Sequence, residues 1–290
     1  MPEGFSYAAA LLPDALRRAA LELPERERAV TEEIRLRAGR EVTALLPEGE
    51  RVLRRGVRAD ARDMTAVLER ATCSSVHSAE HELRRGFVSA AHGVRVGVCG
   101  TLAGGERGGM RNISSVCIRV PRQVRGAGAG AAAAFVRQPA SVLILSPPGG
   151  GKTTFLRELV RASSDAGVRV SLCDERGEVA AVWCSQPQFD VGRCTDVLTG
   201  ADKAEGAMLL LRSMNPQVIA LDEITEGRDV QAIESAANCG VKVYATAHAA
   251  GVDELRRRPL YRSLLDLRAF DAAVVISGAG AQRRYEVVGL

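Results

Sequence analysis

The sequence predicts an α/β fold with a largely parallel central sheet, preceded by a smaller α+β domain. Two short apolar runs, 142–145 and 218–221, have the length and composition of buried parallel strands. The first is followed by a glycine-rich loop, and the second ends in an Asp-Glu pair. From residue 135 onward, strand-like and helix-like segments alternate, as they do in a sheet with helices packed against it.

The first 125 residues contain short elements of both kinds. Helices are predicted at 15–23, 60–71 and 78–86, and the helix at 60–71 has apolar residues at helical spacing. Strands are predicted at 34–37, 42–46, 51–53 and 117–120, with a hairpin within 86–101. This mixture indicates a small α+β domain, which we place at residues 1–128.

A stretch rich in glycine and alanine, 125–134, predicts a linker between the two domains. A flexible connection would let the domains move against each other, although a linker without a mechanical role explains the composition equally well. The second domain is placed at residues 129–290. Its strands are predicted at 142–145, 168–173, 218–221, 241–246, 272–276 and 285–288, and its helices at 152–162, 204–214, 229–239 and 260–267.

Residues 146–154 read S-P-P-G-G-G-K-T-T and lie between a buried strand and a helix, where a phosphate-binding loop belongs. Glycine N–H groups can hold phosphate oxygens, Lys152 would reach the β- and γ-phosphates, and the Thr153 hydroxyl would bind Mg²⁺. Ser146 replaces the first glycine of the usual pattern, a mild departure because the later positions form the cradle. The residues expected to bind the nucleotide are Ser146, Pro147, Pro148, Gly149, Gly150, Gly151, Lys152, Thr153 and Thr154.

Two further strand ends carry residues suited to hydrolysis. Asp222 would hold Mg²⁺, directly or through water, and Glu223 would polarise the attacking water. His248 follows the strand at 241–246 and would sense the γ-phosphate, with a purely structural histidine as the alternative. None of the three lysines lies in an N-K-x-D pattern, so we expect ATP rather than GTP. Together these motifs predict a P-loop ATPase with ATP and Mg²⁺ as cofactors.

The chain resembles the stage III sporulation protein AA family, a branch of the secretion ATPases of the type II and type IV systems. The resemblance extends over nearly the whole chain, including 92–100 and 111–120. Its main motifs are S-P-P-G-G-G-K-T-T-F-L-R (146–157), D-E-R-G-E-V-A (174–180), D-V-G-R-C-T-D-V-L (190–198), K-A-E-G-A-M-L-L-L-R-S-M-N-P (203–216), the pair at 222–223 and A-T-A-H (245–248).

The resemblance implies a RecA-like ATPase that works as a homo-oligomeric ring, with a hexamer expected. It would act with membrane proteins of a sporulation channel, in the cytoplasm at the inner face of a membrane, on the mother-cell side during endospore formation. D-E-R-G-E would be the acidic box of the secretion ATPases, which places Glu175 near the γ-phosphate and Mg²⁺. Glu223 and Glu175 therefore remain alternatives for the residue that positions water.

A ring of this kind also needs a positive charge from the neighbouring subunit. The candidates are three arginines near the acidic box, the 195–198 segment and the helix before the Asp-Glu pair, namely Arg176, Arg193 and Arg212. Arg193 is the one we select for a test, although the sequence does not rank them. A surface salt bridge is the alternative for each.

Composition argues against a membrane-spanning segment, a secretion signal and a zinc site. Apolar residues make up 46% and charged residues 26% of the chain, as in soluble globular proteins, and no uninterrupted apolar run is long enough to span a membrane. The N-terminus lacks the positive charge of a secretion signal. The seven cysteines are odd in number and include no C-x-x-C pair, which predicts reduced, mostly buried thiols in a cytosol and no zinc site.

Two other functions are compatible with a nucleotide-binding fold. A nucleic-acid translocase of the same fold would need a basic track with stacking aromatics, but aromatic residues are only 4% of the chain. The excess of basic residues in the first half could meet an anionic membrane surface or nucleic acid. At its small magnitude we interpret it as a solvated surface, and no nucleic acid is expected. A scaffold that binds ATP without hydrolysing it is the second alternative, and the presence of Glu223 and His248 argues against it.

Overall fold

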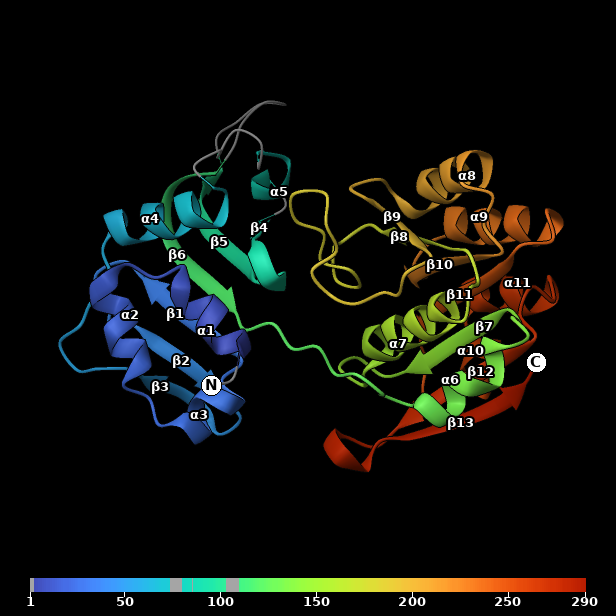
Figure 1. Cartoon of the computed structure of the whole chain (residues 1–290), viewed down its shortest axis with the longest axis horizontal. Helices are drawn as coiled ribbons and strands as arrows, with labels where there is room; N and C mark the ends of the chain where they lie inside the picture. The colour runs from blue at the N-terminus through green and yellow to red at the C-terminus, as the bar shows by residue number, and fades with distance from the viewer. Residues whose placement is uncertain (1–2, 74–79, 85, 103–109) are drawn as a thin grey trace. The chain divides into compact units, whose positions relative to one another are not determined.

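The computed structural model describes residues 3–73, 80–84, 86–102 and 110–290. It forms two compact units (Figure 1). One unit comprises Met1–Arg122 together with the short segment Trp183–Gln188, and the other comprises Gln123–Val182 and Phe189–Leu290.

The first unit is built on a six-stranded antiparallel sheet of order β3-β2-β1-β6-β5-β4. Its strands are β1 (Glu33–Arg37), β2 (Thr43–Leu46), β3 (Gly49–Val52), β4 (Phe87–Ser89), β5 (Arg95–Leu102) and β6 (Met110–Arg119). Its helices are α1 (Glu3–Ala10), α2 (Asp14–Leu21), α3 (Glu25–Val30), α4 (Ala61–Ala71) and α5 (Glu80–Arg84), with a short turn η2 (Ala91–Gly93).

Alternating burial along the strands produces the core of this unit. Ile34 and Leu36 of β1 are fully buried, whereas the residues between and beside them are half-buried, so one face of the sheet packs against helices. The helix predicted at 60–71 is confirmed as α4, whose first turn Asp60 caps by accepting from the N–H groups of Arg62 and Asp63. The helix predicted at 78–86 corresponds to α5, although residues 78, 79 and 85 lie outside the described residues.

The second unit confirms the predicted α/β fold. Its seven-stranded sheet has the order β13-β12-β7-β11-β10-β8-β9, in which every pairing is parallel except that of β12 with β13. The strands are β7 (Val142–Ser146), β8 (Val170–Asp174), β9 (Thr195–Thr199), β10 (Val218–Glu223), β11 (Lys242–His248), β12 (Ala272–Ser277) and β13 (Arg284–Gly289). The helices are α6 (Ala129–Val136), α7 (Lys152–Asp165), α8 (Lys203–Ser213), α9 (Gly227–Asn238), α10 (Val252–Arg257) and α11 (Pro259–Asp266), with a short turn η3 (Gly280–Gln282).

Helices cover both faces of this sheet (Figure 1). In β7, Val142 and Ile144 belong to the apolar cluster beneath α6 and α7, whereas Leu143 and Leu145 belong to the cluster beneath α8, α9 and α11. Strands buried on both faces read as continuous apolar runs, which is why these strands were recognisable in the sequence. The parallel arrangement brings the carboxyl ends of β7, β10 and β11 to one edge of the sheet.

The linker predicted at 125–134 is wrong. Residues Ala129–Val136 form helix α6, and Ala132 and Phe135 are buried in the core that α7 also joins. Alanine is the strongest helix former, so an alanine-rich segment beside an apolar surface folds rather than staying extended. The structure divides the chain between Arg122 and Gln123, before this segment, whereas we placed the boundary after residue 128.

The expectation of mostly buried cysteines is also wrong. All seven cysteines are free thiols, and only Cys173 is fully buried. Burial raises the pKa of the Cys173 thiol to about 12. The exposed cysteines are Cys73, Cys99, Cys184 and Cys239. An apolar neighbour in the sequence did not predict burial, because Cys73, Cys184 and Cys239 lie in turns and Cys99 lies in the exposed half of β5.

The length of the helices bears on membrane insertion. Across the ranges that the structure describes, no helix combines the length and the apolar composition needed to cross a bilayer.

Candidate active site

The loop between β7 and α7 has a conformation that requires glycine. Gly151 has φ of +101°, in the left-handed region. A Cβ on Gly150 would lie only 2.3 Å from the Ser146 Oγ. The Ser146 hydroxyl donates to the Pro147 carbonyl at 2.9 Å, so the residue in place of the usual first glycine closes the turn. The Gly150 N–H also donates to that carbonyl, at 3.1 Å, and would have to leave it in order to bind a phosphate.

A cavity of about 380 Å³ adjoins this loop. It brings together, from distant parts of the second unit, most of the residues that the sequence selected. Those lining it are Pro148, Gly149, Gly151, Lys152, Thr153, Thr154, Asp222, Glu223 and His248, joined by Glu178, Thr246 and Arg283. A larger cavity, of about 1030 Å³ beside α10 and α11, shares none of these residues.

Lys152, His248 and Glu223 form a continuous chain of polar contacts. The Lys152 ammonium, on a side chain that is 7% exposed, donates to His248 Nδ1 at 2.7 Å and to the Ser146 carbonyl at 3.3 Å. His248 Nε2 lies 2.7 Å from Glu223 Oε1. Since an ammonium can only donate, this geometry assigns the imidazole proton to Nε2, from which it is donated to Glu223. Burial lowers the pKa of Lys152, and the carboxylates of Glu223 and Asp222 oppose that shift.

Asp222 lies deeper, beside β11. The Thr246 hydroxyl donates to Asp222 Oδ1 at 3.4 Å. Burial, together with the negative charges of Asp174, Glu178 and Glu223, raises the pKa of the Asp222 carboxyl to about 6. A cluster of carboxylates that raises one member's pKa in this way favours binding of a cation.

Replacement of Asp222 should therefore change the pH dependence of stability. The folded-state pKa of about 6 lies above the ordinary value of 3.8, so the folded chain binds more protons between these values and loses stability as pH rises through about 6. Asp222→Asn removes this effect, and we expect it to stabilise the nucleotide-free, metal-free protein by on the order of 1–3 kcal/mol above that pH.

The measurement is the apparent midpoint of thermal unfolding of both proteins with a chelator present. The advantage of Asp222→Asn over the unsubstituted protein should be small below about pH 4, grow as pH rises to about 6, and be largest at about pH 8. A stability advantage of Asp222→Asn that stays constant or shrinks as pH rises would contradict the raised pKa of Asp222. Asp266→Asn, on the outer end of α11, serves as the matched control.

The loop after β8 positions a glutamate that the sequence analysis did not select. Asp174 is fully buried and accepts from the N–H groups of residues 178–180 at 2.8–3.1 Å. Burial raises the pKa of Asp174, and these N–H groups oppose the shift. Arg157 of α7 donates from the other side, to the Val179 carbonyl at 2.6 Å and the Glu178 carbonyl at 2.7 Å. The loop is therefore fixed, and Glu178 lines the cavity.

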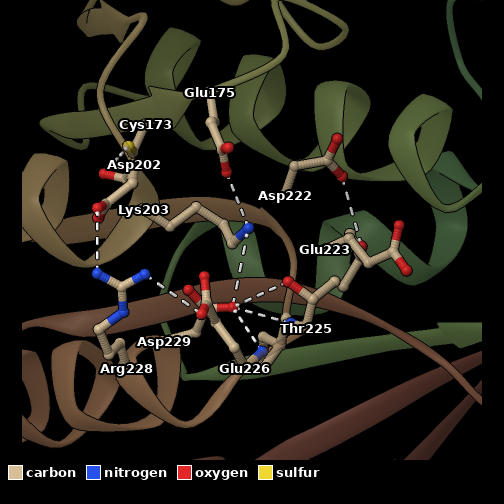
Figure 2. A network of polar contacts seen from close by, with 12 residues as sticks. Cys173, Glu175, Asp202, Lys203, Asp222, Glu223, Thr225, Glu226, Arg228 and Asp229 are labelled. Atoms are coloured by element: carbon tan, nitrogen blue, oxygen red, sulfur yellow. Dashed lines mark hydrogen bonds and ion pairs between the residues drawn. The ribbon is translucent and has the colours of Figure 1, made fainter.

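Glu175 lies in a different polar network (Figure 2). Its carboxylate pairs with the Lys203 ammonium at 2.9 Å, and Lys203 also lies 3.8 Å from Asp229. Asp229 accepts from the N–H groups of Thr225 at 2.8 Å and Glu226 at 3.1 Å. Burial would lower the pKa of Lys203, but its acidic partners overcome this and raise it. The network ties the end of β8 to the segment that follows β10, and Glu175 is not among the residues lining the cavity.

The three arginines that are candidates to complete the site of a neighbouring subunit lie in different parts of the second unit. Arg176 Nη1 lies 4.0 Å from Glu223 Oε2 of the same chain. Arg193 is exposed just before the edge strand β9, with its backbone N–H donating to Asp165 at 3.2 Å. Arg212 is exposed in the last turn of α8. Arg193 and Arg212 are therefore exposed on the surface, whereas Arg176 approaches Glu223 of its own chain.

Known structures share this fold. The pilus retraction motor PilT with bound ADP superposes with a TM-score of 0.64 at 16% identity, covering 91% of this chain and 81% of PilT. The ATPase DotB of Legionella pneumophila superposes with a TM-score of 0.58 at 17% identity, covering 95% of this chain and 79% of DotB. At these identities the likeness shows the fold alone, which this chain shares with PilT and DotB.

Sequence comparison identifies the family. Residues 8–289 match the family described as sporulation stage III, protein AA. Stage III sporulation protein AA of Bacillus subtilis (strain 168) is 36% identical over 281 residues, which are 93% of this chain and 90% of the relative. With a match along nearly its entire length, this chain belongs to the stage III sporulation protein AA family.

Proposed function

We propose that this chain hydrolyses ATP with Mg²⁺ and acts as the motor of a secretion-type channel used in endospore formation. The contact chain from Lys152 through His248 to Glu223, at the edge of a glycine-shaped loop, carries this proposal. It joins the group that would bind the β- and γ-phosphates to the group that would activate water. The family supplies the link to sporulation, and the structural neighbours PilT and DotB are described as a motor and an ATPase.

The residues present fit a nucleotide with Mg²⁺. Gly151 has a left-handed backbone conformation, and Gly150 packs closely against Ser146. At these two positions the loop therefore presents backbone atoms to a phosphate and no side chain. Thr153 and Asp222 both line the cavity and would hold the ion, whose remaining ligands would be phosphate and water oxygens. The bound ion would neutralise charge that develops on the phosphates.

The contact chain suggests how the residues act in sequence. A phosphate oxygen would take the hydrogen bond that Lys152 now donates to His248, because an anion is the stronger acceptor. His248 would then be free to turn and hold the phosphate, and its contact with Glu223 would be released or shifted. Glu223 could accept a proton from water placed in line with the γ-phosphate. In this mechanism His248 makes the activation of water depend on the presence of the γ-phosphate.

A ring, with a hexamer the expected size, would complete the site. The phosphate loop leaves part of the transition-state charge uncompensated, and an arginine from a neighbour would supply the rest. The ring would bind membrane proteins of the channel from the mother-cell side. The resemblance of the motifs to those of the secretion ATPases supports such an assembly, whereas a non-hydrolysing scaffold and a nucleic-acid translocase remain alternatives.

Assembly makes a concentration-dependent prediction. If a neighbour completes the site at a gain of roughly 10³–10⁵ in rate, activity per chain should rise with protein concentration and reach a plateau when rings form. Phosphate release, measured beside the mass from light scattering with and without ATP and Mg²⁺, tests this. Constant activity per chain from nanomolar to micromolar protein, with a monomeric mass, would favour a stand-alone ATPase.

Mixing unsubstituted and variant chains tests whether Arg193 is the arginine that completes the neighbouring site. An excess of Arg193→Ala chains should lower the activity of unsubstituted chains more than dilution does, because mixed rings would contain incomplete sites. Arg262→Ala, at an exposed position on α11, is the matched control and should act only as a diluent. Equal effects of the two variants would exclude Arg193 and leave Arg212 as the next candidate.

A further inference from the structure

The order of strands gives the phosphate loop two different sides. β7, which leads into the loop, lies between β11 and β12. His248, Asp222 and Glu223 all belong to β11 and β10, on one side of β7. Lys152 reaches toward this side, since its ammonium contacts His248. A lysine at this position binds the β- and γ-phosphates, so the opposite end of a nucleotide would extend toward β12 and β13.

Arg283 lies at that opposite side, between η3 and β13. Its Nη2 donates to the Gly149 carbonyl at 3.3 Å. Its guanidinium also covers Gly151, where an added Cβ would lie 3.2 Å from both Nε and the central carbon. The Nε atom is buried and has no hydrogen-bond partner among the described residues. A cation is therefore held against the phosphate loop with one buried donor still unused, an arrangement suited to an anionic ligand.

A second cavity adjoins Arg283. It has a volume of about 680 Å³ and is lined by Ser277, Gly278, Gln282, Arg283 and Arg284. Among the residues that the structure describes, Arg283 is the one that lines both this cavity and the cavity of the phosphate loop. The volume is within the range of small-molecule sites, roughly 300–1,000 Å³. The side chain thus stands at the junction between a space for phosphates and a space large enough for a nucleoside.

We propose that Arg283 binds the α-phosphate of the nucleotide within its own chain, and that the cavity formed by Ser277, Gly278, Gln282, Arg283 and Arg284 holds the ribose and base. This placement rests on the proposed function and deepens it. It divides the recognition of ATP between two sides of β7. The β10 and β11 side acts on the γ-phosphate, whereas the β12 and β13 side binds the part of the molecule that ATP and ADP share.

Arg283→Met tests the contact with the α-phosphate. Methionine keeps an unbranched side chain over Gly151 but removes the charge and the donors. In a Glu223→Gln background, which suppresses turnover, calorimetry with Mg²⁺ should show affinities for ATP and ADP reduced alike, by about 10-fold or more. Unchanged affinities in a folded variant, or a loss confined to ATP, would overturn this assignment, because the second result would place the guanidinium at the γ-phosphate.

Ser277→Trp tests the nucleoside cavity. Ser277 is exposed at the end of β12, so an indole there would fill the cavity without entering the core. Binding of ADP should weaken by about 10-fold or more, as a bulky group excludes the nucleoside, while inorganic pyrophosphate should bind as before. Equal loss for both ligands, or loss for neither, would overturn the placement of the nucleoside.

Arg262→Met in the same background is the control for removing an exposed arginine, and it should leave all affinities unchanged. The failure of this inference is distinguishable from that of the proposed function. If the unsubstituted chain binds ATP but Arg283→Met and Ser277→Trp bind it equally well, only the placement fails. If the unsubstituted chain binds none of the three ligands, the proposed function fails, and the placement fails with it.

Discussion

Glu223→Gln is expected to lower ATP hydrolysis by about 10²-fold or more while ATP still binds. Glutamine keeps the size of the side chain and one oxygen near His248 Nε2, but it cannot accept a proton from water. The present contact between His248 and Glu223, at 2.7 Å, shows that the carboxylate already faces the cavity. Phosphate release and binding of a fluorescent ATP analogue should be measured on the same preparation.

Two neighbouring glutamates provide the comparison. Glu175→Gln should reduce activity less, because Glu175 is paired with Lys203 and does not line the cavity. Glu178→Gln tests the other glutamate that does line it. If turnover survives in Glu223→Gln and is lost in Glu175→Gln, the roles of the two carboxylates must be exchanged, with Lys203 releasing Glu175 during the reaction.

Lys152→Ala should remove most of the affinity for ATP. The side chain delivers a positive charge, almost out of contact with water, to the place where two phosphates would lie. Charge-assisted hydrogen bonds of this kind are worth about 1.5–3 kcal/mol each, so the dissociation constant should rise by roughly 10- to 100-fold or more. Titration with a fluorescent ATP analogue in the presence of Mg²⁺ measures the change directly.

Lys242→Ala is the matched control for that titration. Lys242 begins β11 in the same sheet, but its side chain is 41% exposed and pairs with Asp271 at the surface. This variant should bind ATP like the unsubstituted chain. A folded Lys152→Ala protein with undiminished affinity would show that the glycine-rich loop is not a phosphate site.

The sequence predicted those residues of the candidate site whose signal lies in the neighbouring sequence. Lys152 and Thr153 follow a glycine run, and Asp222, Glu223 and His248 end apolar strands, so each has a signal within a few neighbouring residues. Parallel strands deliver their ends to one edge of a sheet, and this brought the motifs together as expected. The α/β fold was predictable for the same reason, because fully buried strands are continuous apolar runs.

Features that depend on distant contacts were not predicted. Arg283 lies far along the chain from Gly151, and only the pairing of β12 with β7 brings it to the loop. Glu178 and Glu175 belong to one short acidic motif, and their different surroundings arise from Arg157 and Lys203, which lie on separate helices. Nothing local to the motif distinguishes the two glutamates.

The prediction of secondary structure failed where the composition of a segment and its contacts in the fold favour different structures. Residues Ala129–Val136 have the composition of a linker, yet alanine favours helix and Phe135 supplies an apolar anchor in the core. Strand β9 was not predicted because none of its residues is fully buried, so it lacks the apolar run of its neighbours. Pairing with β8 at the edge of the sheet, rather than its own composition, makes it a strand.

Release of inorganic phosphate from ATP with Mg²⁺ tests the central claim most directly. The purified chain should be assayed at micromolar concentration beside a variant that carries both Lys152→Ala and Glu223→Gln. The account predicts steady phosphate release by the unsubstituted chain and background release by the double variant. Equal release by both proteins would place any activity elsewhere, and binding of ATP without release at concentrations where rings form would leave the chain a nucleotide-dependent scaffold.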